Sequence, residues 1–249
     1  MKKIFAIAAI ALFMASCSDD DSTSNNTENT VLLKKTIETS SEGTLTSTFT
    51  YSGTKLTKIT RNDGSYDEYI YEGDLVTSIK YHEGGEIIQE DIFTYNSDNK
   101  LATFTTLSFD EEIGDKNEYI YNSNGTITVN GYYGDLDSQT YEGGTGTITI
   151  TNGNIIKYES DGEVFQYTYD SKNFPLKNIT SYDSMTLSYP EAGGGLNNTV
   201  TYTANFGGSD DESSVFSYTY NAAGYPLTST EVLNSFGDEE QINIQYFYE

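Results

Sequence analysis

Side chains that commonly carry acid–base or metal chemistry are scarce in this chain. His82 is the only histidine, and it lies in Tyr81-His82-Glu83-Gly84-Gly85, a pattern typical of a hairpin tip. A Ser-His-Asp arrangement would have to use this one imidazole, which we interpret as a solvated turn residue. Cys17 is the only cysteine, so a zinc site would have little besides oxygen ligands. We therefore expect no cofactor and no metal.

Carboxylates, in contrast, are abundant, since the chain contains 38 Asp and Glu residues. They cluster at 110–112, 210–212 and 238–240. Two carboxylates about 5 to 9 Å apart could hydrolyse a glycosidic bond, and their oxygens could bind calcium. However, neither Asp-x-Asn-x-Asp-Gly loops nor Gly-Gly-x-Gly-x-Asp repeats are present. We interpret the clusters as solvated loop charges and expect no enzymatic activity.

The net charge of −25 at pH 7 limits the choice of partners. A chain this acidic repels phosphate backbones and offers no Lys/Arg stripe that could release counterions, so we expect no nucleic-acid partner. The same repulsion acts against anionic lipid surfaces. Attachment to a membrane would therefore have to come from a lipid anchor rather than from charge.

The amino-terminal segment has the pattern of an export signal. Lys2 and Lys3 precede eleven apolar residues at 4–14, and the small residues Ala15-Ser16 come directly before Cys17. Eleven apolar residues are too few for a spanning helix, which needs about 20. The segment resembles the lipobox of a bacterial lipoprotein. The resemblance implies cleavage before Cys17 and lipidation of its thiol, which attaches the protein to a membrane without crossing it.

An acidic run follows the cysteine: Ser18, Asp19, Asp20 and Asp21. It resembles the tag that directs Bacteroidota-type lipoproteins to the outer face of the outer membrane. This resemblance implies an outer-membrane, lipid-anchored protein exposed at the cell surface.

Composition divides the chain into three segments. Residues 1–16 form the predicted lipoprotein signal peptide. Residues 17–30 comprise the lipidated cysteine and a tether rich in Ser, Thr, Asn, Asp and Glu, which cannot bury enough apolar surface to fold. Residues 31–249 carry short apolar and aromatic runs and are predicted to form one β-hairpin repeat domain.

A short aromatic unit recurs along this domain. It places two rings on either side of one residue, and the second rings are Tyr51, Tyr71, Tyr95, Tyr121, Tyr169, Tyr220 and Tyr248. The two rings lie on one face of a strand because strand side chains alternate. Two long gaps in the recurrence are predicted to hold degenerate units at 147–158 and 199–206.

Turn signals follow the tyrosines directly. Asn122-Ser123-Asn124-Gly125 is one of four, with similar tetrapeptides at 96–99, 170–173 and 221–224. Asn or Asp opens such a turn by bonding its own backbone, and Gly or Asn near its end tolerates positive φ. The sequence therefore predicts an all-β, antiparallel meander of repeated hairpins that forms a curved, extended or barrel-like sheet. No stretch has sustained helical periodicity.

After most turns, a Leu and a second apolar residue are separated by three positions. The pairs are Leu56 and Ile59, Leu101 and Phe104, and Leu176 and Ile179. A spacing of three puts the two side chains on opposite faces of a regular strand. We therefore predict a bulge at this place or a second apolar layer on the far face. Pro175 and Pro226 precede leucines at positions where a strand can begin.

The unit Tyr-x-Tyr-Asn/Asp-x-x-Gly/Asn-x-Leu resembles the YD (RHS-like) repeat of bacterial surface proteins over most of residues 49–248. It lacks the arginine typical of that repeat, because Arg61 is the only arginine in the chain. Taken together, lipobox, acidic tag and repeat resemble Bacteroidota-type surface lipoproteins of unknown function. The resemblance implies an extended or barrel-like meander and supplies no catalytic motif.

Three functions are compatible with these features. We expect a non-catalytic binding or structural module whose tyrosines pack ring on ring in a core. The first alternative is a glycan-binding accessory protein of a polysaccharide uptake system, with tyrosines exposed to stack on sugars, and the second is a glycoside hydrolase. The partners would be the membrane and an extracellular glycan or surface protein. A transmembrane barrel is a structural alternative, although its strands need about 9 to 11 residues and an apolar outer band.

Overall fold

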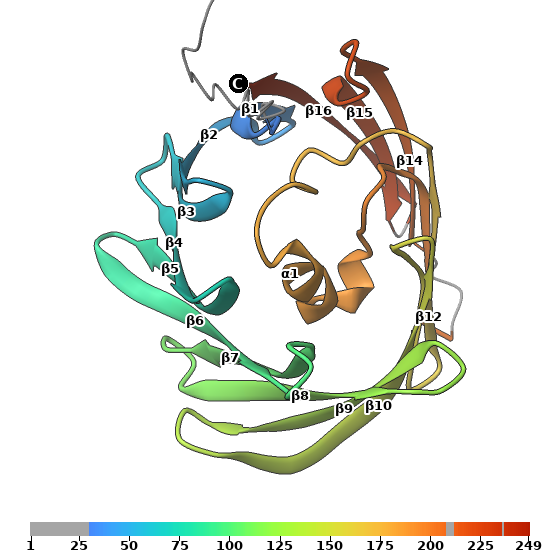
Figure 1. Ribbon diagram of the computed structural model, residues 1–249. Coiled ribbons are helices and arrows are strands. Elements are labelled where there is room, and N and C mark those ends of the chain that lie inside the picture. Colours follow the sequence, from blue (N-terminus) through green and yellow to red (C-terminus); the bar gives the residue numbers. More distant parts are fainter. Residues whose placement is uncertain (1–29, 208–211, 236) are drawn as a thin grey trace, which may run out of the picture.

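The computed structural model describes residues 30–207, 212–235 and 237–249. In this part of the chain, sixteen antiparallel strands form one closed barrel (Figure 1). Each strand pairs with its neighbours in sequence, and β16 pairs with β1. Backbone hydrogen bonds between Leu32 and Glu249 extend this closure beyond the last ladder pair. The predicted antiparallel sheet is confirmed, and it closes into a barrel.

The first eight strands are β1 (Leu33–Ser40), β2 (Gly43–Ser52), β3 (Lys55–Arg61), β4 (Tyr66–Glu72), β5 (Leu75–Glu83), β6 (Glu86–Tyr95), β7 (Leu101–Ser108) and β8 (Ile113–Tyr121). The other eight are β9 (Thr126–Asp135), β10 (Gln139–Thr151), β11 (Asn154–Ser160), β12 (Glu163–Tyr169), β13 (Thr199–Asn205), β14 (Glu212–Tyr220), β15 (Pro226–Ser235) and β16 (Asp238–Tyr248). Between β12 and β13 lie the α-helix α1 (Tyr182–Ser188) and the 3₁₀ helix η1 (Pro190–Ala192). Among the described residues, no helix has the length and apolar character needed to cross a membrane.

Alternation along each strand separates an aromatic inner face from a mostly polar outer face, on which Ile70, Ile120 and Phe247 are exposed apolar residues. In β2, Phe49 is buried and Tyr51 half-buried, whereas Thr48 and Thr50 are exposed. The same alternation exposes the residue between the two rings in the other aromatic units, as at Thr168 between Tyr167 and Tyr169 in β12. The inner faces form the core of the barrel.

The spacing of three is explained by a bulge, as predicted. In β3, Leu56 pairs with Tyr51 and Lys58 pairs with Thr50, so Thr57 is an extra residue in the ladder. The bulge turns Leu56 back to the side of Ile59, and both side chains are buried. Leu101 and Phe104 in β7 are brought together by the same irregularity. Here the sequence pattern encodes both the bulge and the core.

The turns form by the predicted mechanism. The Asn96 side chain accepts hydrogen bonds from the backbone N–H groups of Asp98 and Lys100, and Asn99 has φ = 58°. In the turn at 221–224, the Asn221 side chain accepts from the N–H of Ala223, and Gly224 has φ = 79°. These side chains close the hairpins because they replace backbone partners that the reversing chain lacks.

The prediction for Leu176 and Ile179 is wrong. Both lie in residues 170–198, which leave the sheet after β12 and enter the barrel instead of forming another hairpin (Figure 1). We call this segment the plug. The turn at Asp170 forms as expected, but Phe174 then donates its N–H to the carbonyl of Leu196, within the plug itself. Pro175 therefore starts no strand, whereas Pro226 does begin β15 as predicted.

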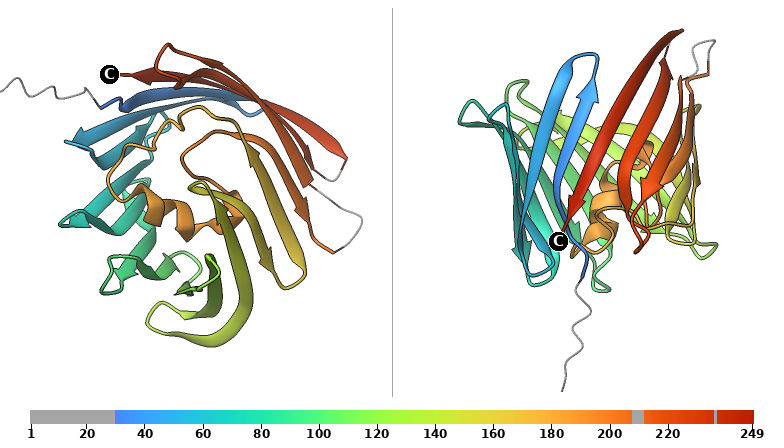
Figure 2. Two further views of the ribbon diagram at one scale, coloured as in Figure 1. Left: turned by 45° about the vertical axis from the view of Figure 1, so that its right-hand side comes forward. Right: turned by 90° about the horizontal axis from the view of Figure 1, so that it is seen from above.

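The degenerate units are only partly as predicted. Residues 147–158 lie in β10 and β11, and β13 covers most of 199–206, so both contain strands. The long gap before Tyr220 contains β13, which pairs with β14, and also the plug. The plug lies in the half of the barrel that carries the C-terminus (Figure 2, right).

Candidate functional site: the plugged interior of the barrel

The plug is fastened to the wall by tyrosine hydroxyl groups. Tyr119 donates to the carbonyl of Leu187 at 3.0 Å, and Tyr167 donates to the carbonyl of Glu191. The Tyr169 hydroxyl accepts from the backbone N–H of Gly194 at 3.0 Å. These contacts satisfy backbone groups of a segment without a sheet partner of its own. The plug is thus held to β8 and β12 through main-chain atoms.

A buried carboxylate connects the plug to the opposite part of the wall. Asp91 in β6 is 0% exposed and accepts four hydrogen bonds. The donors are Gln89 at 2.9 Å, Thr106 at 3.0 Å, Tyr81 at 2.9 Å and, from the plug, Tyr189 at 2.9 Å. Burial raises the pKa of Asp91 above its usual value, while the four donors act to lower it.

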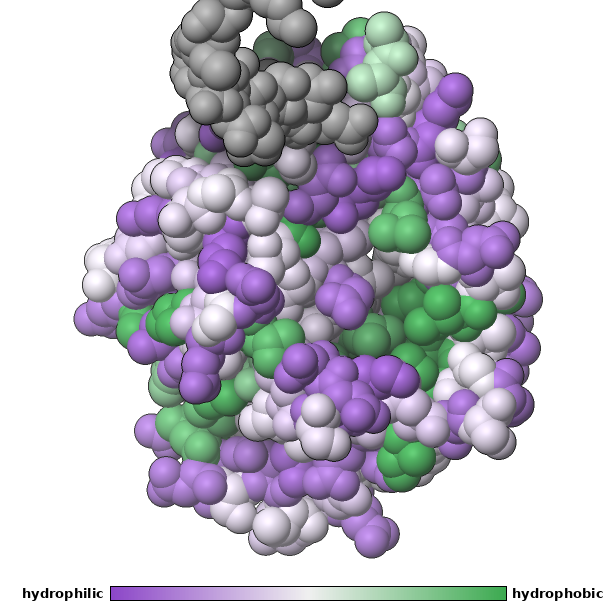
Figure 3. Space-filling model, viewed as in Figure 1, coloured by the Kyte–Doolittle hydropathy of each residue, from purple (hydrophilic) through white to green (hydrophobic). Residues whose placement is uncertain are grey.

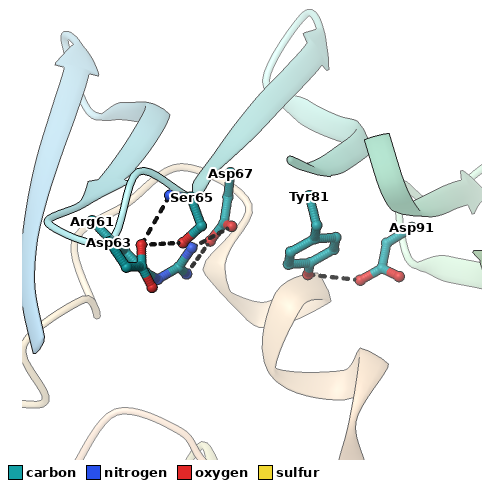
Figure 4. A network of polar contacts seen from close by, with 6 residues as sticks. All are labelled: Arg61, Asp63, Ser65, Asp67, Tyr81 and Asp91. Carbon is teal, nitrogen blue, oxygen red and sulfur yellow. Dashed lines mark hydrogen bonds and ion pairs between the residues drawn. The ribbon is translucent and has the colours of Figure 1, made fainter. Parts of the chain in front are cut away.

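An ion pair lies in the same region of the wall (Figure 4). The Arg61 guanidinium donates to both carboxylate oxygens of Asp67, with Nη1–Oδ1 and Nη2–Oδ2 distances of 2.8 and 2.6 Å. The side chain of Asp67 is only 4% exposed, and hydrogen bonding to it raises the pKa of Arg61. The only arginine of the chain is therefore committed to one buried carboxylate.

Two cavities flank the helix of the plug. One of about 380 Å³ lies between α1 and strands β3–β6, and its lining includes Tyr69, Tyr81, Asp91, Tyr182 and Tyr189. The other, of about 350 Å³, lies between the plug and strands β10–β11. Viewed from the plugged end, hydrophobic side chains gather in a hollow between the centre and the β12 side of the barrel, within a largely hydrophilic face (Figure 3).

The aromatic residues predicted as the structural repeat all lie on the inner side of the wall, where they are half-buried: Tyr51, Tyr71, Tyr95, Tyr121, Tyr169, Tyr220 and Tyr248. Four of them donate from their hydroxyl to a carbonyl on the preceding strand, in the pairs Tyr51–Leu33, Tyr95–Val76, Tyr121–Leu101 and Tyr169–Ile155. Tyr220 instead donates to the Asp170 carboxylate. Cys17, Ser18, Asp19, Asp20 and Asp21 lie outside the described residues.

His82 is placed differently from the prediction. It lies in β5 just before the turn, and its ring stacks on Tyr66 at a centroid distance of 4.1 Å. Its side chain is 11% exposed, so it is a packed residue rather than a solvated one.

The acidic clusters lie at the edges of the hairpins. Residues 110–112 connect β7 and β8, and residues 238–240 begin β16, while positions 210 and 211 lie outside the described residues. In the described part of the chain, no group of three or more His, Cys, Asp or Glu side chains could hold a metal ion.

Sequence reasoning missed Asp67 and Asp91 as interior residues. Each stands two positions before an aromatic unit, at 69–71 and 93–95, and alternation therefore puts it on the aromatic face. With 38 acidic residues in the chain, these two positions were not distinguished from the exposed acids. A carboxylate in phase with a buried ring pair is the pattern that would have identified them.

No protein-family model matches the chain, and no curated protein is similar to it. Solved structures do share its fold. A porin-like protein from Bacteroides uniformis ATCC 8492 superposes with a TM-score of 0.55 and 15% identity, covering 87% of this chain and 98% of that chain. A porin-like protein from Bacteroides vulgatus ATCC 8482 gives 0.51 and 12%, covering 88% and 99%. At these identities, the similarity establishes the barrel fold of this chain.

Proposed function

We propose that this chain is a non-catalytic lipoprotein of the outer membrane, anchored through Cys17 and exposed at the cell surface, where it acts as a binding or structural module. The observation that carries this proposal is the polar outer wall of the barrel. An anchor outside the barrel, rather than the barrel itself, would then hold the protein to the membrane.

The outer wall carries polar side chains on strands around the barrel, and the exposed apolar residues among them, such as Ile120, Val215 and Phe247, are scattered over different strands. Exposed threonine pairs bridge neighbouring strands at Thr94–Thr103, Thr168–Thr201 and Thr219–Thr228, with hydroxyl distances of 2.6–2.7 Å. Lys116 pairs with Glu118 at 2.9 Å, and Lys157 pairs with Glu159 at 2.7 Å. A lipid-facing wall needs a continuous apolar band about 25 Å tall, and each charged side chain at the bilayer midplane costs about 2–4 kcal/mol.

The likeness to porin-like proteins supports an association with the outer membrane, since those proteins share the closed barrel. The interior argues against an open channel, because α1 and the rest of the plug pack against the inner tyrosines. A barrel with a mostly polar outer wall and a plug in its interior suits a rigid module on a tether. The charge of −25 would keep neighbouring copies apart.

Lipid attachment is tested by expressing the full chain and Cys17→Ala in a Gram-negative host and measuring incorporation of labelled palmitate. The proposal expects label on the wild-type chain alone, and protease treatment of intact cells should digest the labelled protein. An unlabelled wild-type chain, or one recovered in the soluble fraction, would contradict the anchor. Label with full protease resistance would contradict surface exposure only.

Glycan binding is the second candidate, and one exposed aromatic pair favours it. Tyr133 and Tyr141 are 52% and 65% exposed, and their rings stack at a centroid distance of 5.5 Å. They are available to a sugar ring because of this exposure, whereas the buried and half-buried tyrosines of the core are not. Affinity gels containing polysaccharides should retain the wild-type protein but not Tyr133→Ala. The matched control is Tyr132→Ala, which changes the neighbouring ring beside Lys116.

A further inference from the structure

The cavity between α1 and strands β3–β6 combines an apolar lining with a buried negative charge. Leu56, Ile79 and Met185 contribute apolar surface, and the rings of Tyr69 and Tyr182 add aromatic surface. Asp91 is the only acidic or basic side chain in this lining. The volume of about 380 Å³ is within the range of pockets that bind small molecules, about 300–1,000 Å³.

The hydrogen bonds of Asp91 determine which polar groups the cavity offers. An ionised carboxylate only accepts hydrogen bonds, so Tyr81 and Tyr189 must direct their hydroxyl protons toward it. Their oxygens retain lone pairs. Gln89 and Thr106 lie 3.2 and 3.4 Å from the Tyr189 oxygen, whereas Asp91 is the hydrogen-bond partner of the Tyr81 hydroxyl. The cavity therefore presents an acceptor at Tyr81, polarised by the carboxylate behind it.

Asp91 forms no ion pair with a Lys, Arg or His side chain in the described part of the chain. Buried carboxylates are normally paired with a cation, as Asp67 is paired with Arg61. Since Arg61 is already bound by Asp67 with both of its terminal nitrogens, it is not available to Asp91. Tyr189 is 36% exposed, so the group that joins Asp91 to the plug borders on solvent. The overall charge of −25 further attracts small cations.

We propose that this cavity binds a small organic ammonium ion with an apolar or aromatic body. The ammonium N–H group donates to the Tyr81 hydroxyl, Asp91 balances the positive charge, and the tyrosine rings contact the body of the ligand and the cation. This inference deepens the proposed binding role by naming a ligand class, but it does not depend on the lipid anchor.

The test uses three ligands of the same shape and different charge. The full-length chain, purified in detergent, is titrated by calorimetry with 2-phenylethylamine, 2-phenylethanol and phenylacetate. The amine should bind at least about tenfold more tightly than the alcohol, because its hydrogen bond is charge-assisted, and the carboxylate should bind most weakly. No saturable binding of the amine to the folded wild type, or equal affinity for amine and alcohol, would overturn the proposal.

Variants of two tyrosines in the same lining separate the proposed contact from general packing. Tyr81→Phe removes the acceptor and should reduce the ratio of amine to alcohol affinity to about one. Tyr69→Phe removes a hydroxyl that is not among the four donors to Asp91 and should leave the ratio unchanged. Unchanged selectivity in Tyr81→Phe, or equal loss in both variants, would contradict the assigned geometry.

Two further variants test the charge and the location. Asp91→Asn should abolish the preference for the amine over the alcohol. Circular dichroism checks that this variant is folded. If Asp91→Asn does not fold, the affinity ratio of Tyr81→Phe tests the proposal instead. Met185→Trp fills the cavity and should eliminate binding of both amine and alcohol. Amine binding that survives Met185→Trp would place the site elsewhere. Palmitate labelling at Cys17 is measured separately, so failure of the anchor and failure of amine binding are distinguishable.

Discussion

Removing the guanidinium of Arg61 should destabilise the barrel far more than removing any cation from its outer wall. Arg61→Ala leaves the Asp67 carboxylate, with a side chain only 4% exposed, without its partner. Breaking a buried ion pair typically costs about 3–5 kcal/mol, because an uncompensated charge is left in the interior. The Arg61 side chain is itself 26% exposed, so water can partly replace it. We therefore expect a loss of about 3 kcal/mol, at the low end of that range.

The assay is urea unfolding of the detergent-solubilised chain, followed by far-UV circular dichroism. Lys116→Ala is the matched control, since Lys116 pairs with Glu118 on the outer wall, where such pairs contribute less than about 1 kcal/mol. Adding Asp67→Asn to Arg61→Ala should recover part of the loss, because the orphaned charge is removed. If Arg61→Ala lowers the free energy of unfolding no more than Lys116→Ala does, the buried ion pair between Arg61 and Asp67 does not stabilise the barrel as argued.

Three further perturbations probe the interior. Tyr121→Phe should lower the free energy of unfolding in urea by about 1 kcal/mol because it removes the hydrogen bond to the Leu101 carbonyl. Tyr248→Phe should be neutral or stabilising because the buried Tyr248 hydroxyl has no partner in the described structure; equal losses would contradict this. Leu101→Ala should cost about 2–5 kcal/mol, and a loss below 1 kcal/mol would show that the bulge site is loosely packed. The folded-state pKa of Asp91 is raised, so its ionisation favours the unfolded state, and wild type should gain stability relative to Asp91→Asn as pH falls from 7 to 4. If Asp91→Asn instead gained stability relative to wild type as the pH falls, the predicted direction would be wrong.

Local features of the wall follow directly from sequence patterns. Alternation around Tyr69 and Tyr71 predicts one aromatic face. The three-residue spacing of Leu56 and Ile59 predicts a bulge or a second apolar layer, and the structure has the bulge, which restores their common orientation. Asn221 and Gly224 predict their turn by the same local physics. These features depend on residues close together in sequence, so a single chain is enough to infer them.

The plug and the closure of the barrel could not be inferred in this way. The turn at Asp170 has the same side-chain-to-backbone bond as the hairpin turns, so nothing before Phe174 distinguishes the plug from another hairpin. The difference is that the chain then enters the barrel instead of forming a strand. Contacts between residues far apart in sequence hold it there, such as the hydrogen bond from the Tyr119 hydroxyl to the Leu187 carbonyl, 68 residues apart. Closure likewise depends on β1 meeting β16 across the whole domain.

The most direct test of the account measures whether the outer wall is in water. Single cysteines at Thr50, Thr168 and Thr219, which are exposed around the barrel, are labelled with a membrane-impermeant maleimide in opened outer-membrane preparations. The wild-type chain measures the background labelling at Cys17. A cysteine at Ala204, which is 1% exposed, measures labelling of a residue buried in the interior. The account predicts rapid labelling at the three wall positions and none at Ala204 until the protein is unfolded. Protection of all three wall positions in membranes, relieved by detergent, would show that the wall faces lipid and would contradict the account.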